Sequence, residues 1–195
     1  MRRARVPTIW LFTDERLGGA HPDDPLWQAL ARLPRGAGIV FRHYSLALAA
    51  RTALLARVAR LARRRGLLLV GSRIQGAPDG VHRTAHAPSG RRTPGRLVTA
   101  SAHSRPQALA AFRAGADLVF LSPVFPTRSH SGAPVLGPLR FGLASRNLPG
   151  PLIALGGMTC ARFGRLAPLG ANGYAGIDCW SRQAPAQPGI SSARC

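Results

Sequence analysis

The sequence contains no lysine, so its 27 basic residues are all arginine, against only 7 acidic residues and a formal net charge of +20. The arginines are scattered from Arg2 to Arg194 rather than gathered in one basic block. No stripe of arginines interleaved with aromatics is present. We therefore interpret the charge as a general preference for arginine that permits anionic ligands. Nucleic-acid binding is the weaker alternative, and it predicts an affinity that falls steeply with salt.

Cysteines and long apolar runs are also scarce. The three cysteines, Cys160, Cys179 and Cys195, are odd in number and widely spaced, so they predict neither a disulfide framework nor a metal-ligand pattern. The basic start resembles a signal peptide, but Asp14 and Glu15 interrupt its apolar stretch. No run approaches the roughly 20 apolar residues of a membrane span. We expect a soluble, cytoplasmic protein with no membrane partner.

Short apolar runs alternate with helical patterns along the chain. The strands are expected at residues 8–14, 38–44, 67–72, 79–83, 96–103, 117–125, 151–157 and 173–180. The helices are expected at residues 25–33, 45–66, 106–116 and 159–171. The helix over 45–66 has the clearest signals, because Ser45 is a favourable N-cap, leucines and alanines repeat at spacings of three and four, and Gly66 is a favourable stop.

Eight strands, most of them followed by helices, predict an α/β protein with a single (β/α)8 TIM barrel. A doubly wound open sheet is the competing architecture. The barrel is expected over residues 1–180, followed by a disordered tail at 181–195. It must be compact, with trimmed loops, because the fold typically takes about 250 residues. The link over 73–78 is too short for a helix and leaves closure of the barrel open.

The carboxyl ends of the strands form the ligand-binding face of such barrels. Gly156 and Gly157 follow the seventh strand, where glycines allow backbone N–H groups to approach a phosphate, although many such pairs are ordinary turns. The stretch SPVFPTRSHSG over residues 122–132 follows the sixth strand and contains hydroxyls, an arginine and a histidine. It is consistent with a phosphate-binding loop or with a solvated loop.

Four segments carry a family resemblance: GRLVTASAHS, AGADLVFLSPVFPTRSHSGAPVLG, PLIALGGMT and LGANGYAGID. In order and spacing they resemble thiamine phosphate synthases and the related thiazole tautomerases. The resemblance is strong over residues 95–178 and weaker, but collinear, from residue 11. It implies a transferase of thiamine biosynthesis that joins a pyrimidine methyl diphosphate to thiazole phosphate and releases pyrophosphate. It also implies Mg²⁺ as cofactor, phosphorylated small-molecule partners and, as in many synthases, a homo-oligomer.

The resemblance also assigns roles to single residues. It places Arg42 and Ser101 against the diphosphate as the catalytic residues, and the planar fork of Arg42 suits a bidentate phosphate contact. The further phosphate-binding positions that it implies are Thr127, Arg128, Ser129, Gly156, Gly157, Ile177 and Asp178.

The chain departs from the family in the pyrimidine and metal subsites. Val40 and Tyr44 replace a glutamine and a lysine, Gly71 and Ser72 replace an Asn-Asp pair, and Ala87 lies near the position of a second aspartate. Both expected magnesium carboxylates are absent, so no protein ligand for the metal is predicted. The cations that remain to offset part of the ion's charge are Arg42, Arg73, Arg83 and Arg128.

The remaining acids offer few substitutes for the lost carboxylates. Asp79 and Asp117 precede strands and are expected at the opposite, stabilising face of the barrel. Asp14, Glu15 and Asp178 are the acids expected to reach the site.

One proline and three histidines bear on whether the protein is a synthase or a tautomerase and on which residues have a chemical role. Pro123 stands where the tautomerases have a histidine, which disfavours that activity. His82 and His103 are expected on strands, where a packed, hydrogen-bonded role is favoured over a general base, whereas His130 lies in the loop near the ligand. Loss of both metal carboxylates, with the phosphate-binding positions retained, leaves a second hypothesis open: a non-catalytic binder of thiazole phosphate.

Overall fold

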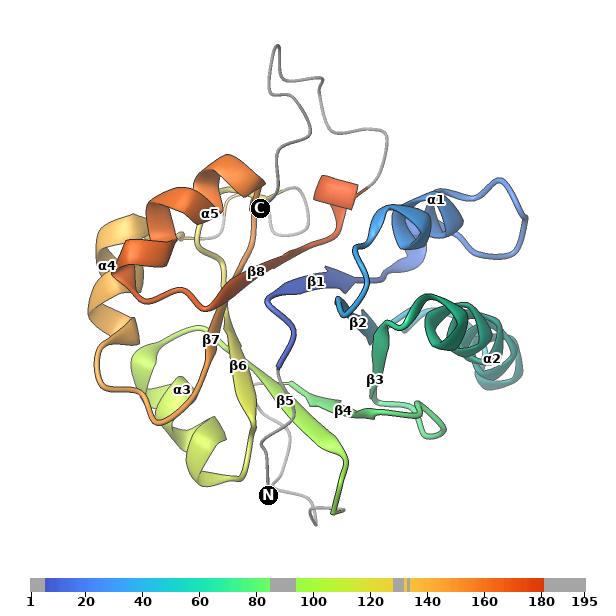
Figure 1. Ribbon diagram of the computed structural model, residues 1–195, viewed down its shortest axis with the longest axis horizontal. Helices are drawn as coiled ribbons and strands as arrows, with labels where there is room; N and C mark the ends of the chain where they lie inside the picture. Colours follow the sequence, from blue (N-terminus) through green and yellow to red (C-terminus); the bar gives the residue numbers. More distant parts are fainter. Residues whose placement is uncertain (1–5, 85–93, 128–131, 133, 181–195) are drawn as a thin grey trace.

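The computed structural model describes residues 6–84, 94–127, 132 and 134–180. Its eight strands are all parallel and pair in chain order into a closed barrel (Figure 1). The strands are β1 (Ile9–Phe12), β2 (Gly38–Phe41), β3 (Leu68–Ser72), β4 (Gly80–Arg83), β5 (Leu97–Ala102), β6 (Leu118–Leu121), β7 (Leu152–Leu155) and β8 (Gly173–Gly176). The helices are α1 (Pro25–Arg32), α2 (Leu48–Arg65), α3 (Arg105–Arg113), α4 (Gly137–Ser145) and α5 (Cys160–Leu166), with 3-10 turns η1 (Glu15–Leu17), η3 (Ala167–Leu169) and η4 (Asp178–Trp180).

The predicted barrel is confirmed, and the short link after β3 does not prevent its closure. β4 pairs with β3 through Val70 and Gly80 and with β5 through Gly80 and Leu97. The strands are shorter than expected: β3 and β4 begin one residue later than predicted, and the other predicted runs included loop residues that follow the strands. Pairing of β1 with β8 closes the ring, which rules out the open sheet.

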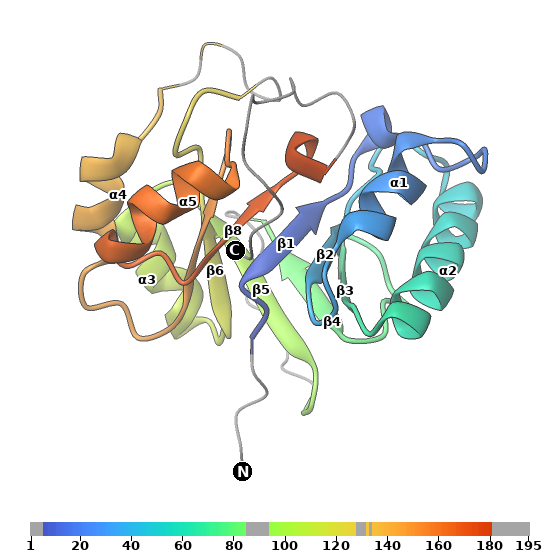
Figure 2. The same cartoon turned by 45° about the horizontal axis from the view of Figure 1, so that its top comes forward.

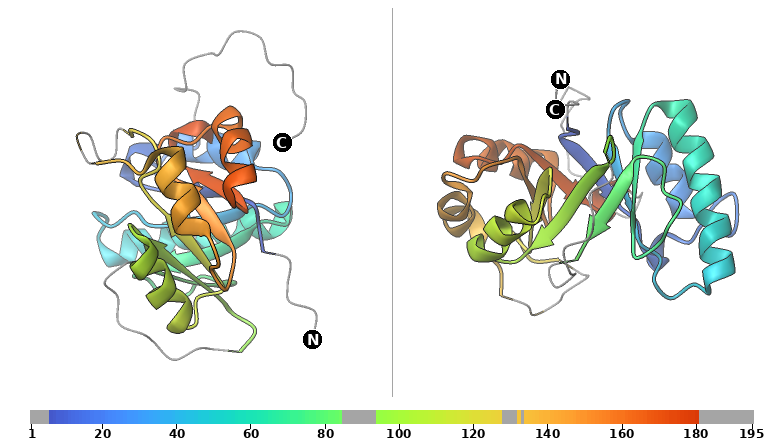
Figure 3. Two further views of the ribbon diagram at one scale, coloured as in Figure 1. Left: turned by 90° about the vertical axis from the view of Figure 1, so that its left-hand side faces the viewer. Right: turned by 90° about the horizontal axis from the view of Figure 1, so that it is seen from below.

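The helices form two groups on opposite sides of the barrel. α1 and α2 lie outside β1–β3, and α3, α4 and α5 lie outside β5–β8 (Figures 1 and 2). Within the described residues no helix joins β3 to β4 or β4 to β5. Seen from below, β4 and β5 lie between the two groups (Figure 3). Val81 of β4 is consequently 39% exposed, although valine is usually buried in a barrel strand.

The longest helix, α2, ends as predicted but begins later. Gly66 adopts the left-handed conformation at its C-cap (φ 64°) and its N–H donates to the carbonyls of Ala62 and Arg63. Ser45 is not the N-cap; that position belongs to Ala47, which has no side-chain capping bond. The Ser45 N–H instead donates to the Glu15 carboxylate at 2.7 Å. The prediction of Ser45 as N-cap was therefore wrong. Its backbone N–H is bonded to the Glu15 carboxylate of η1, and the helix begins only at Leu48.

Side chains just before the strands hold the amino ends of neighbouring strands. Asp79 accepts from the Leu69 N–H at 2.7 Å, and Asp117 accepts from the Val98 N–H at 2.9 Å. These contacts confirm that both aspartates lie at the face opposite the predicted site.

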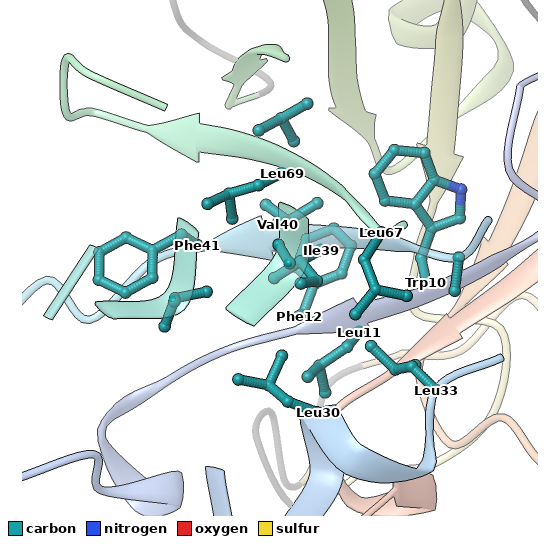
Figure 4. Close-up of a cluster of buried hydrophobic side chains, with 14 of the residues drawn as sticks. Trp10, Leu11, Phe12, Leu30, Leu33, Ile39, Val40, Phe41, Leu67 and Leu69 are labelled. Carbon is teal, nitrogen blue, oxygen red and sulfur yellow. The ribbon is translucent and has the colours of Figure 1, made fainter. Parts of the chain in front are cut away.

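Large aromatic side chains fill the middle of the barrel. Trp10 and Phe12 each pack edge-on against Phe120, with ring centroids 5.2 and 4.7 Å apart. Figure 4 shows Val40 among the apolar side chains of β1, β2 and β3, and it is fully buried. Val40, which stands where the family has a glutamine, is therefore a core residue.

Candidate functional site

Arg42 follows β2 directly and is fixed at the carboxyl end of the barrel. Its Nε donates to the Thr13 carbonyl at 3.0 Å, and its Nη2 lies 3.6 Å from the Asp14 carboxylate. The guanidinium carbon stands 5.3 Å from the centre of the Phe12 ring. The side chain keeps 21% exposure, and burial lowers its pKa, although an arginine remains charged. The result is an oriented cation with one edge still available to a ligand.

Asp14 is engaged by arginines. It accepts from the Arg16 backbone and side chain, at 3.1 and 2.8 Å, and caps η1. With the Arg42 contact, this carboxylate lies between two guanidinium groups. Asp14 thus lies next to Arg42 at the end of the barrel strands, where its carboxylate helps to orient the guanidinium.

Arg51, which the sequence reasoning missed, ties together the ends of β2 and β3. The residue is 7% exposed, and its guanidinium donates to three backbone carbonyls, of Arg42 at 2.8 Å, Arg73 at 2.8 Å and Ser72 at 2.5 Å. The sequence does contain a signal for this buried position: Arg51 shares one face of α2 with Leu55 and Val58, four and seven residues later, and that face is buried.

The diverged positions after β2 and β3 contact each other. The Tyr44 and Ser72 hydroxyls are 2.7 Å apart, and the Tyr44 ring has the guanidinium groups of Arg51 and Arg73 at 5.3 and 5.4 Å. Gly71 leaves no room for a side chain, since a Cβ would lie 3.0 Å from Ala77 and Ile74. The short link after β3 packs where the family's asparagine would stand. The residues that stand in place of the family pattern are therefore packed against one another or against the link that follows β3.

His82 connects two hydroxyl-bearing residues of β5 inside the barrel. Its Nδ1 lies 2.8 Å from the Thr99 hydroxyl and its Nε2 lies 3.0 Å from the Ser101 hydroxyl. Burial, aided by the charge of Arg42, lowers the pKa of His82 to about 3. The imidazole is therefore neutral near pH 7, which confirms the packed, hydrogen-bonded role expected of this residue.

A second buried histidine, His43, was not singled out from the sequence. Its Nδ1 is 3.0 Å from the Thr13 hydroxyl and its Nε2 is 2.8 Å from the Gly18 carbonyl. The carbonyl must accept from Nε2–H, so Nδ1 accepts from Thr13, whose oxygen in turn accepts from the Arg42 N–H. Burial lowers the pKa of His43 as well. This chain of bonds fixes the backbone on which Arg42 stands.

The exits of β6 and β7 pack closely. The Val124 N–H donates to Leu155 and the Phe125 N–H donates to Gly156, at 2.9 and 3.1 Å. Both Gly156 and Gly157 have positive φ, and a Cβ on Gly157 would lie 2.4 Å from the Pro126 carbonyl. These glycines are therefore required by packing, whatever they bind.

The other predicted site residues divide into three groups. Thr127 is half-buried at the β6 exit, Ile177 is buried after β8, and Asp178 begins η4. His103 lies beyond β5 and is exposed, and its Nδ1 donates to the Ser122 carbonyl, so its predicted strand position was wrong. The predictions that lie outside the described residues concern Ala87, Arg128, Ser129 and His130.

The described residues do not fit a protein-held magnesium ion. Nowhere among them do three His, Cys, Asp or Glu side chains gather. Ser72 stands where a carboxylate was expected and bonds to Tyr44, and Asp14 is held by arginines. Magnesium usually takes at least one carboxylate along with substrate phosphates. No step of the reaction is therefore assigned to a metal below. The described helices also include none long and apolar enough to cross a membrane.

The fold and the position of these residues define the class: a (β/α)8 barrel whose candidate site lies at the carboxyl ends of its strands. The family model described as thiamine monophosphate synthase matches residues 11–179. The chain belongs to this family.

Individual relatives agree with that assignment. A thiamine-phosphate synthase of Anaeromyxobacter dehalogenans is 32% identical over 87% of this chain and 78% of its own length. One from Chlorobium luteolum is 44% identical, but over only 44% of this chain and 41% of its own length. The chain thus aligns with less than half of that protein, so activity is not transferred from it directly.

Solved structures support the fold alone. A thiamine phosphate pyrophosphorylase from Pyrococcus furiosus superposes with a TM-score of 0.70 at 22% identity, covering 87% of this chain and 85% of that one. FabK from Thermotoga maritima superposes with a TM-score of 0.63 at 19% identity. Because the same barrel serves different functions, the function must be argued from the site.

Proposed function

We propose that this protein is a transferase of thiamine biosynthesis that joins a pyrimidine methyl diphosphate to thiazole phosphate. The observation that carries the proposal is the guanidinium of Arg42, fixed at the end of β2 by Thr13 and Asp14, in a chain of the thiamine monophosphate synthase family that also keeps the Ser101 hydroxyl near the end of β5. Both residues occupy positions that the family resemblance assigns to the diphosphate. The barrel unit is proposed to span residues 1–180.

The proposed reaction needs charge stabilisation more than proton transfer. The bond between the pyrimidine methylene carbon and the diphosphate oxygen breaks, and its electron pair leaves with pyrophosphate. The thiazole nitrogen then donates a lone pair to the resulting cation and forms the new C–N bond. Arg42 and Ser101 would stabilise the negative charge that grows on the leaving group, which is the usual task of preorganised donors.

The thiazole phosphate is proposed to bind on the other side of the mouth, at the ends of β6, β7 and β8. The backbone of Gly156, Gly157, Ile177 and Asp178 is proposed to line this subsite. Thr127, Arg128 and Ser129 are its proposed side-chain contacts. The support for this subsite is the backbone turn after β7, where both glycines have positive φ and carry no side chain that would cover their N–H groups.

Production of thiamine phosphate tests the proposal. Purified protein with both substrates should form thiamine phosphate and pyrophosphate in equal amounts. No product from protein whose circular dichroism shows a folded barrel would refute the transferase.

A second candidate, a non-catalytic binder of thiazole phosphate, is favoured by one observation. The Tyr44 and Ser72 hydroxyls bond to each other where the family has a lysine and a metal-binding aspartate. Calorimetry separates the two candidates: the transferase should bind the pyrimidine diphosphate and the thiazole phosphate, whereas the binder should take only the thiazole phosphate.

A further inference from the structure

We propose that His82 is a positioning residue that holds Ser101 as a hydrogen-bond donor toward the phosphate oxygens of the substrate. This inference rests on the proposed function, because it assumes that Ser101 faces a phosphate group. In the proposed role His82 neither binds a metal nor transfers a proton. It sets the direction in which the Ser101 hydroxyl proton points.

The strand register brings the three side chains together. His82 on β4 lies opposite Thr99 on β5, and Ser101, two residues further along β5, points to the same side of the strand. The imidazole therefore lies between two hydroxyls, 2.8 Å from Thr99 and 3.0 Å from Ser101. Phe12 and Phe120 pack edge-on against its ring at 5.4 and 5.6 Å. These contacts fix the plane of the imidazole.

Burial of Thr99 selects one tautomer. Thr99 is fully buried, and within the described residues the His82 Nδ1 is the one acceptor within reach of its hydroxyl proton. If Nδ1 carried the imidazole proton, the Thr99 O–H would be a buried donor with no acceptor, which is costly. The favoured arrangement has the Thr99 O–H donating to Nδ1 and the Nε2–H donating to the Ser101 oxygen.

That tautomer decides what Ser101 offers to a ligand. Because its oxygen accepts from His82, the Ser101 O–H is directed away from the imidazole, and Ser101 is only half-buried. In the opposite tautomer the Ser101 O–H would donate to Nε2, and the lone pairs of the Ser101 oxygen would face the anion. The depressed pKa of His82 keeps the ring neutral and preserves this polarity near pH 7.

Arg42 and His82 share Phe12 as a neighbour. Its guanidinium and the His82 ring both contact Phe12, at 5.3 and 5.4 Å from the ring centre. The charge of Arg42 also helps to lower the pKa of the imidazole, so the guanidinium acts on the same region of the barrel as His82. A diphosphate placed there receives a directed O–H donor and a cation.

Nitrogen NMR of the wild-type imidazole tests the tautomer without any mutation. The inference predicts a protonated Nε2 and an unprotonated Nδ1 for His82, with and without inorganic pyrophosphate. A protonated Nδ1 in the presence of pyrophosphate would overturn it.

Pyrophosphate binding measured by calorimetry tests the effect on the ligand. His82→Leu should raise the Kd for pyrophosphate about tenfold, the usual effect of losing one hydrogen bond to a charged group. His82→Gln should recover much of the affinity, because its amide can accept from Thr99 and donate to Ser101. Thr99→Val should weaken binding, whereas Thr99→Ser should not.

A double-mutant cycle separates positioning from general damage. In a Ser101→Ala background, His82→Leu should have no further effect on the Kd. Leu33→Ala, which opens the buried end of α1, is the matched control and should lower the melting temperature without changing the Kd. Additive effects of His82→Leu and Ser101→Ala would refute the positioning role.

The two failures are distinguishable. If the protein forms thiamine phosphate but the cycle is additive, the inference fails and the proposed function stands. If wild-type protein neither binds pyrophosphate nor forms product, both fail.

Discussion

The two halves of the barrel mouth differ in how much of the family pattern they keep. At the ends of β5–β8 the chain retains Ser101, Pro123, Thr127 and the glycine pair after β7. At the ends of β2 and β3 it has replaced the polar family residues, yet the new side chains are bonded. Tyr44 contacts Ser72, and Arg51 holds three carbonyls. A site that had merely decayed would leave buried polar groups without partners.

In the first half, at the ends of β2 and β3, arginine side chains make the main polar contacts. Arg42 is oriented by Thr13 and Asp14, and Arg51 stabilises the strand ends behind it. In a chain without lysine, the planar guanidinium has a structural role at Arg51 and is proposed to bind the ligand at Arg42. In the second half, backbone groups and small side chains form the mouth.

The largest expected effect comes from Arg51. Arg51→Met should lower the free energy of unfolding by about 3 kcal/mol, because it removes three hydrogen bonds and leaves the buried Ser72 carbonyl without its donor. The matched variant in the second half is Arg162→Met, which removes one carbonyl contact, to Gly157, and a stacking contact with Phe125. It should cost about 1 kcal/mol. Equal losses in urea unfolding would contradict the contrast between the halves.

Arg42 should dominate diphosphate binding. Arg42→Ala should raise the Kd of the pyrimidine diphosphate about 100-fold, since a charge-assisted bidentate contact is lost. Arg42→Lys keeps the charge but not the fork, so it should recover only part of the affinity. The Kd of thiazole phosphate, measured by calorimetry on the same variants, should stay within about twofold. A loss shared equally by both ligands would show that the two subsites are not separate.

Acid should destabilise the folded protein through the buried His82. The pKa of His82 is about 3 in the folded protein and 6.5 ordinarily, so the unfolded chain binds the proton more tightly. Stability is thus complete above about pH 6.5 and falls toward pH 3, by about 1.4 kcal/mol per pH unit for one histidine. Urea midpoints measured at falling pH should show this slope, and His82→Leu should reduce it. A slope unchanged by His82→Leu would contradict the assignment.

Metal removal should have the smallest effect on binding. Because the described residues offer no carboxylate cluster, the affinity for inorganic pyrophosphate should change by less than about twofold when EDTA replaces Mg²⁺. Calorimetry in the two buffers measures this. A large loss in EDTA would show that the protein contributes ligands to a metal.

Much of the fold was predictable because its signals are local. The apolar runs gave the strand order, and Gly66 gave the end of α2. Helix α4 was missed because a glycine and a proline weaken its pattern and its buried face has only Phe141 and Ala144. The ends of six strands were placed too late, because the residues that follow these strands in the loops were included in the predicted runs, whereas the ends of β3 and β4 were placed correctly.

The site was predictable only in part. Arg42 and Ser101 were found through a family resemblance, and the structure places both at the mouth. The link from His82 to Ser101 depends on the β4–β5 register, and that of Arg51 to the ends of β2 and β3 depends on the packing of α2. Both arise from residues far apart in sequence, so no local pattern reveals them.

Product formation from both substrates tests the central claim most directly. The purified protein, mixed with the pyrimidine methyl diphosphate and thiazole phosphate, should yield thiamine phosphate and an equal amount of pyrophosphate, and Arg42→Ala should abolish most of this activity. Absence of thiamine phosphate from folded wild-type protein that binds both substrates would contradict the claim that this site performs the transfer.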